Sequence, residues 1–202
     1  MWTTDEGLAG VCVHVANDGP APLKGALRVA LYRDAEILVE RAEADVELAP
    51  HGSIDRDVEE MLGRFVDASG AYGFGSPTHD LVVATLYDEL GVRRSQHLRF
   101  LHNRPWEARR NEQIGLTAEP ASRTRDGVEL NLRSRAAAIG VRVRMAGFEP
   151  SDDVFDIAPD DEVAIALRCQ EPGSTAASAA ITADNLAGVV TVDFRAAERA
   201  NP

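Results

Sequence analysis

The sequence has little positive charge, and almost none of it comes from lysine. It carries 21 Lys plus Arg against 33 Asp plus Glu, a formal net charge of −12, and Lys24 is its single lysine. Nucleic-acid binding requires clustered cations that neutralise phosphates, so this balance predicts no nucleic-acid partner. The same shortage argues against an anionic membrane surface. No apolar run nears the roughly 18 residues that span a bilayer, so we also expect no membrane-spanning segment.

Cysteine is equally scarce. Cys12 and Cys169 lie far apart, both within apolar strand patterns, and neither has the spacing of a metal-ligand motif. We therefore expect two buried thiols rather than a disulfide, which would require the two ends of the chain to meet. Residues 1–6 contain neither a basic nor an apolar signal region, so a cytoplasmic location is the expectation.

The pattern that is abundant is alternation of apolar and polar residues, which is typical of strands. Val11, Val13 and Val15 share one face of such a segment, and Cys12 and His14 take the other. Turn-forming residues separate many such segments at intervals of about 8 to 12 residues, which predicts sandwiches rather than alternating strand–helix units. The expected strands are residues 8–16, 27–32, 37–48, 81–87, 92–101, 116–118, 128–132, 139–145, 154–157, 163–167, 179–183 and 189–194.

The predicted architecture is all-β, with two tandem immunoglobulin-like β-sandwich domains. We place the first at residues 1–103, a polar linker at 104–113, and a second, smaller sandwich at 114–202. One segment departs from alternation: residues 55–65 place apolar side chains at helical spacing. This predicts one short helix in the first domain, with Ser53 as its N-cap.

Three stretches carry a resemblance to a known family. They are residues 7–23, residues 62–80, and residues 151–162, which read SDDVFDIAPDDE. In this order they resemble the C-terminal immunoglobulin-like domains of family 2 glycoside hydrolases of the β-mannosidase type.

The resemblance implies a parent enzyme with a retaining mechanism, in which an acid/base glutamate and a nucleophile glutamate lie on a catalytic barrel. That mechanism needs two carboxylates about 5 to 5.5 Å apart. Neither glutamate's motif is present in this sequence. We therefore expect no catalytic residue, no cofactor and no metal here. The expected role is that of an accessory region in carbohydrate metabolism, with a catalytic barrel domain or subunit of a glycosidase as its partner.

A stand-alone carbohydrate-binding module or a protein-interaction module remains an alternative. Aromatic residues make up only 5% of the chain, and most are expected in the core. Tyr72 and Phe74, on a glycine-rich segment, and Trp106, near a domain edge, are the candidate contacts to a sugar or to another domain.

Two further patterns favour structural roles. The acidic residues between 152 and 161 could be read as a calcium site, but they lack the regular alternation and the glycine of a dedicated loop. We therefore expect turn caps and exposed charges. His79 and Asp80 are adjacent, and neighbours on a strand point to opposite faces, which argues against a catalytic dyad.

Overall fold

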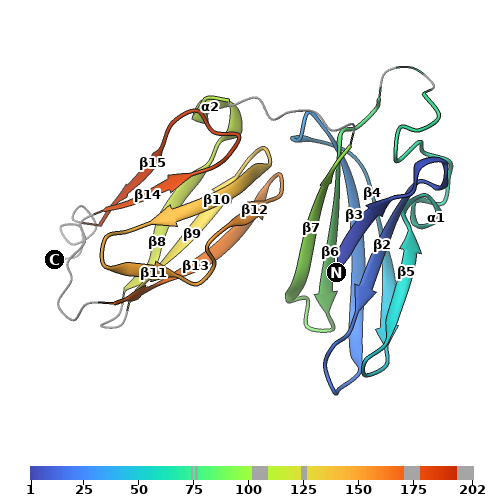
Figure 1. Ribbon diagram of the computed structural model, residues 1–202, viewed down its shortest axis with the longest axis horizontal. Helices are drawn as coiled ribbons and strands as arrows, with labels where there is room; N and C mark the ends of the chain where they lie inside the picture. Colours follow the sequence, from blue (N-terminus) through green and yellow to red (C-terminus); the bar gives the residue numbers. More distant parts are fainter. Residues whose placement is uncertain (74, 76, 102–108, 124–126, 171–177, 195–202) are drawn as a thin grey trace. The chain divides into compact units, whose positions relative to one another are not determined.

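The computed structural model describes residues 1–73, 75, 77–101, 109–123, 127–170 and 178–194. The chain forms two compact units, Met1–Arg104 and Pro105–Pro202. Both are built from antiparallel strands, as Figure 1 shows, and the predicted all-β fold is confirmed. Among the described residues, no helix has the length and hydropathy needed to cross a bilayer.

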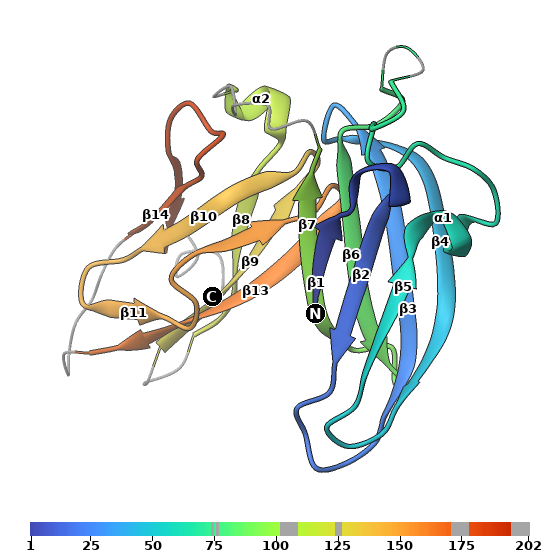
Figure 2. The ribbon, with the colours of Figure 1, turned by 45° about the vertical axis from the view of Figure 1, so that its right-hand side comes forward.

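In the part of the first unit that the structure describes, the strands form two sheets. One contains β1 (Trp2–Asp5), β2 (Val11–Ala16) and β5 (Ser53–Asp57), in the order β1-β2-β5. The other has the order β4-β3-β6-β7, from β4 (Ile37–Leu48), β3 (Leu23–Arg33), β6 (Leu81–Asp88) and β7 (Arg93–Phe100). Figure 2 shows these sheets face to face.

The core of the first unit lies between the two sheets. As the alternation predicted, Val11, Val13 and Val15 are buried on β2, and they belong to the same cluster as Leu27 and Val29 on β3. A 3-10 turn, Gly7–Ala9, joins β1 to β2. The residues of β2 that alternate with the valines, including Cys12 and His14, therefore point away from this core.

The short helix is present, but its predicted start is wrong. The helix α1 spans Val58–Leu62, and its N-cap is Asp57, whose carboxylate accepts the backbone N–H groups of Glu59 and Glu60. Ser53 belongs to β5 instead. Gly63, with a φ of 69°, ends the helix, so Phe65 lies outside it.

The second unit is also a sandwich in its described residues. One sheet has the order β12-β10-β14-β15, and the other has the order β11-β13-β9-β8. Their buried side chains form one cluster. The strands are β8 (Thr117–Arg123), β9 (Gly127–Ser134), β10 (Ala138–Arg144), β11 (Phe148–Pro150), β12 (Phe155–Ile157), β13 (Asp161–Cys169), β14 (Ser178–Thr182) and β15 (Val190–Asp193).

Of the region expected as a linker, the structure describes residues 109–113. The backbone N–H of Arg109 donates to the Asn185 carbonyl at 2.8 Å, so this end of the region is hydrogen-bonded to the second unit. The helix α2 spans Asn111–Ile114, and Ile114, which the sequence had already placed in the second domain, is fully buried in the core of that unit.

The two cysteines differ from the expectation in one respect. No disulfide joins Cys12 and Cys169, as predicted, but both side chains are only partly buried.

Candidate functional site

Tyr72 lies in the segment between α1 and β6, and both its side chain and its backbone are hydrogen-bonded. Its hydroxyl donates to the Leu8 carbonyl at 3.1 Å, and its backbone N–H donates to Asp67 Oδ2 at 3.2 Å. Its ring meets the Phe65 ring edge-on, with 5.1 Å between the centroids. Both side chains are exposed, Tyr72 to 40% and Phe65 to 56%. The segment thus presents a pair of aromatic rings to solvent.

A concavity of about 290 Å³ adjoins this pair. Val39, Glu40, Arg64 and Phe65 contribute to its lining, together with Asp67. Arg64 Nε donates to Glu40 Oε1 at 3.0 Å, so this carboxylate is paired with a cation. Gly70, Gly73 and Gly75 also line it.

Of the three aromatic candidates, only Tyr72 can be placed, because Phe74 and Trp106 lie outside the described residues. Phe65 was missed from the sequence, where its spacing suggested a buried helical position. The signal that could have identified it is Gly63, since a glycine is a frequent helix terminator.

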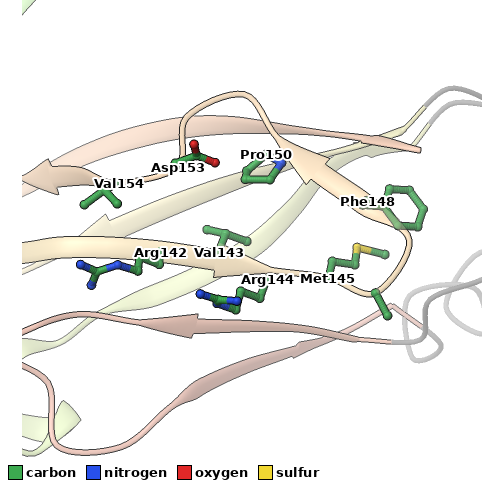
Figure 3. A pocket seen from close by; sticks show the side chains of 9 residues that line it. Arg142, Val143, Arg144, Met145, Phe148, Pro150, Asp153 and Val154 are labelled. Atoms are coloured by element: carbon green, nitrogen blue, oxygen red, sulfur yellow. The ribbon is translucent and has the colours of Figure 1, made fainter. Parts of the chain in front are cut away.

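A second, larger hollow lies in the second unit (Figure 3). It has a volume of about 530 Å³ and lies between β10, which contributes Arg142 and Arg144, and β11, which contributes Phe148. Arg142 Nη1 donates to Asp184 Oδ1 at 2.6 Å. Among the described residues, the carboxylate that lines this hollow is that of Asp153. The described lining thus combines two guanidinium groups, an aromatic ring and one carboxylate. Retaining hydrolysis needs two carboxylates about 5 to 5.5 Å apart.

The acidic stretch at 152–161 contains backbone caps. Asp156 Oδ1 accepts the Gly140 N–H at 2.8 Å, and Asp161 Oδ1 accepts the Glu162 N–H at 2.7 Å. Asp160 has a φ of 56°, a conformation that Asp tolerates better than most residues in a turn. These contacts support the reading of this stretch as turn chemistry.

His79 and Asp80 lie just before β6, not on a strand as the sequence argument assumed, and they have separate hydrogen-bond partners. His79 is buried, with Nε2 at 3.2 Å from the Ala68 carbonyl and Nδ1 at 3.0 Å from Thr78 Oγ1. Asp80 Oδ1 accepts the Ala35 N–H at 3.0 Å. Both side chains thus bind neighbouring loops.

Glu6, Cys12 and His14 form a cluster that the sequence reasoning missed. Their potential ligand atoms all lie within 4.8 Å of one another, and no other such group of three occurs within the described ranges. Burial, reinforced by the charges of Asp55 and Glu6, raises the pKa of the Cys12 thiol. The alternation on β2 had already placed Cys12 and His14 on one face, which was the available signal.

Comparison with known proteins gives structural likeness alone. No protein-family model matches the chain, and no curated protein sequence matches it. The β-D-mannosidase of Dictyoglomus thermophilum aligns with 89% of this chain at 17% identity and a TM-score of 0.63. The exo-chitosanase CsxA of Amycolatopsis orientalis aligns with 90% of it at 15% identity and a TM-score of 0.59.

This chain spans only 21% of the mannosidase chain and 25% of the exo-chitosanase chain. At these identities the likeness establishes a shared fold. The resemblance read from the three sequence stretches is therefore confirmed at the level of the fold: the chain has the architecture of a part of much longer glycosidases.

Proposed function

We propose that this chain is a non-catalytic accessory region that supports the catalytic barrel of a β-mannosidase-like glycoside hydrolase. The barrel would belong to the same polypeptide or to a partner subunit. The observation that carries the proposal is the coverage: about nine tenths of this chain aligns with about a quarter of each glycosidase chain. A region of this kind acts by packing against the barrel and contributes no reacting group.

An apolar surface in the first unit supports the proposal. Val39, near the start of β4, and Phe65 are exposed and line the same concavity, and Ile37, two residues before Val39, is exposed as well. We call these three residues the β4 patch. In the described sheet β4 is one of the two edge strands. Outer strands of soluble proteins usually carry protective charges, and contiguous exposed apolar residues mark contact surfaces.

The first experiment tests for catalysis on the chain itself. We expect the purified chain to release no p-nitrophenol from p-nitrophenyl β-D-mannoside or β-D-glucosaminide above the buffer rate. Turnover that rises in proportion to the concentration of the pure chain would contradict a non-catalytic role.

The second experiment tests the β4 patch in the native assembly purified from source cells. The double change Val39→Asp and Phe65→Ser should lower the yield of assembled hydrolase at least severalfold, because it places a charge where apolar contact is expected. Leu90→Ser is the matched control, since Leu90 is 86% exposed in the turn between β6 and β7. Equal yields from the two variants would count against the patch as the contact surface.

The exposed Phe65–Tyr72 pair favours one other function, carbohydrate binding, because aromatic rings stack on sugar rings. Under this alternative, the chain binds mannose or glucosamine oligosaccharides in calorimetric titration, and Tyr72→Ala removes the binding. Tyr72→Phe keeps the ring but loses the hydrogen bond to Leu8, and so separates stacking from loop order. This alternative is rejected if the titration of the unmodified chain shows no heat of binding, or if Tyr72→Ala binds the oligosaccharides as well as the unmodified chain does.

A further inference from the structure

The outer face of the β1-β2-β5 sheet gathers chemically reactive side chains. Cys12 and His14 are two residues apart on β2, so they share the face opposite to the buried valines. In the strand register His14 lies opposite Asp55 on β5, and Thr4 lies opposite Cys12 on β1. Residues from two neighbouring strands therefore surround the thiol and the imidazole.

Glu6 joins this group from the turn that follows β1. Its Oε1 accepts the Thr4 hydroxyl at 3.0 Å and lies 4.0 Å from His14 Nε2. The cluster thus combines a thiol, an imidazole and a carboxylate, the three donor types that zinc takes in proteins. Calcium and magnesium prefer oxygen donors, so sulphur and nitrogen together select against them.

The imidazole is already oriented for a metal. His14 Nδ1 lies 2.8 Å from Asp55 Oδ1, and a carboxylate there fixes the tautomer that leaves the Nε2 lone pair available. Trp2 stacks on the ring, with 5.1 Å between centroids and an angle of 18° between the planes. The His14 side chain is only 17% exposed. Its ring therefore has a defined position, as a metal ligand requires.

The Thr4 hydroxyl lies between two potential acceptors. The Thr4 hydroxyl has one hydrogen, yet it lies within hydrogen-bonding distance of both Glu6 Oε1, at 3.0 Å, and His14 Nε2, at 2.7 Å. When Nδ1 carries the ring proton, Nε2 and the Glu6 carboxylate compete for that single hydrogen. A cation between Nε2, Glu6 and Cys12 satisfies both acceptors.

The separations suit a tetrahedral site after small side-chain movements. Zinc–ligand distances of about 2.0 to 2.3 Å place tetrahedral ligand atoms roughly 3.3 to 3.8 Å apart. The present separations are all within 4.8 Å. The Glu6 side chain is 47% exposed, so it can rotate and bring its carboxylate to the shorter separation that a tetrahedral zinc site requires.

We propose that Glu6, Cys12 and His14 form a zinc site, with Asp55 as the positioning residue for His14 and a water molecule as the fourth ligand. The negative charges of Asp55 and Glu6, which disfavour a thiolate alone, favour a divalent cation at the same place. The site ties the segment after β1 to β2. It is independent of the proposed accessory function.

The test is a calorimetric titration of the complete chain with Zn²⁺ after removal of metals by a chelator. We expect one zinc per chain, and a loss of affinity of at least tenfold in Cys12→Ser and in His14→Ala. Cys169→Ser is the matched control, because Cys169 lies on β13 in the second unit. Asp55→Asn should keep the stoichiometry and weaken binding about 10- to 100-fold, as expected for a group that orients a ligand.

Cobalt provides a second readout that does not depend on heat. Bound Co²⁺ should show a thiolate charge-transfer band in the wild-type chain and in Cys169→Ser, and none in Cys12→Ser. Circular dichroism of the metal-free variants checks that each retains the β fold. The proposal is overturned if the folded wild-type chain binds no zinc, if Cys12→Ser titrates like the wild type, or if Cys169→Ser removes the cobalt band.

Discussion

At the scale of the residue, Asp88 shows how one carboxylate closes a hairpin. Its Oδ1 accepts the backbone N–H groups of Leu90 and Val92, each at 2.9 Å, and its Oδ2 accepts Nε of Arg94 at 2.7 Å. These bonds are stronger to the ionised carboxylate than to the protonated carboxyl group. The Val92 N–H, followed by Arg94 and Leu90, therefore holds the pKa of Asp88 below its ordinary value of 3.8.

This lowered pKa has a definite sign for stability. The contribution of Asp88 is complete above its ordinary pKa and is lost as the pH falls through the lower, folded-state value. Asp88→Asn should therefore be less stable than the wild type at pH 7. The difference in stability between the two chains should become smaller below pH 3.8. Thermal unfolding of both chains at a series of pH values from 7 downward measures this difference as a difference in midpoint temperature.

Arg94→Ala is the control for this prediction. Asp88→Asn keeps an accepting oxygen for the two backbone N–H groups but loses the charge and the acceptor for Arg94. Arg94→Ala loses only the bond from the guanidinium and keeps the charged carboxylate on both N–H groups, so its loss of stability at pH 7 should be smaller. If the stability difference between Asp88→Asn and the wild type stays constant across the whole pH range, the Asp88 charge does not stabilise the folded chain as stated here.

At the scale of the element, α1 depends on its cap more than on its length. A helix of five residues, Val58–Leu62, is too short to be stable alone. Its N-terminal N–H groups are bound by Asp57, and Val58 anchors it in the core. The cap and the anchor together hold the segment that leads to Phe65 and Tyr72.

Asp57→Ala should accordingly reduce the free energy of unfolding of the first unit by about 0.5 to 2 kcal/mol. Asp57→Asn keeps a capping oxygen and should recover most of that loss. Chemical denaturation followed by circular dichroism measures both. Equal losses in the two variants would show that the Asp57 charge, and not its capping oxygen, stabilises the helix.

The elements also show what local sequence could and could not predict. Strands with several alternating residues were predicted, although their limits were less certain: β4 was predicted with its observed limits, Ile37–Leu48, whereas the strand predicted at 27–32 extends over Leu23–Arg33 as β3. The three-residue strand β11 was missed, because Phe148–Pro150 is too short to show a period. The strand β1 was missed because its apolar content is low: Trp2–Asp5 includes two threonines and an aspartate.

The candidate sites were less predictable than the strands. Tyr72 was identified from its glycine-rich surroundings, but its partner Phe65 was not, because Gly63 ends the helix two residues before it. The proposed zinc ligands come from one strand, β2, and the turn after β1. Asp55, which orients His14, is 41 positions from it in the sequence. Only the strand register brings such residues together, and register depends on pairing across the whole sheet.

At the scale of the whole molecule, two sandwiches with separate cores follow one another along the chain. Each buries its own apolar cluster, so each has the means to fold as a unit. Their combined likeness to a quarter of each glycosidase chain is the basis of the proposed accessory role. In that proposed role, the catalytic residues lie on a barrel outside these two units.

One measurement tests this role most directly. Antibodies against the chain would isolate the native protein from its source cells under non-denaturing conditions, and the isolate would be analysed for mass and for exo-β-glycosidase activity. The account predicts activity in the isolate, together with a barrel-containing polypeptide. The chain itself would be part of a band several times heavier than 21.8 kDa or firmly bound to one. A single inactive species of 21.8 kDa would contradict the accessory role.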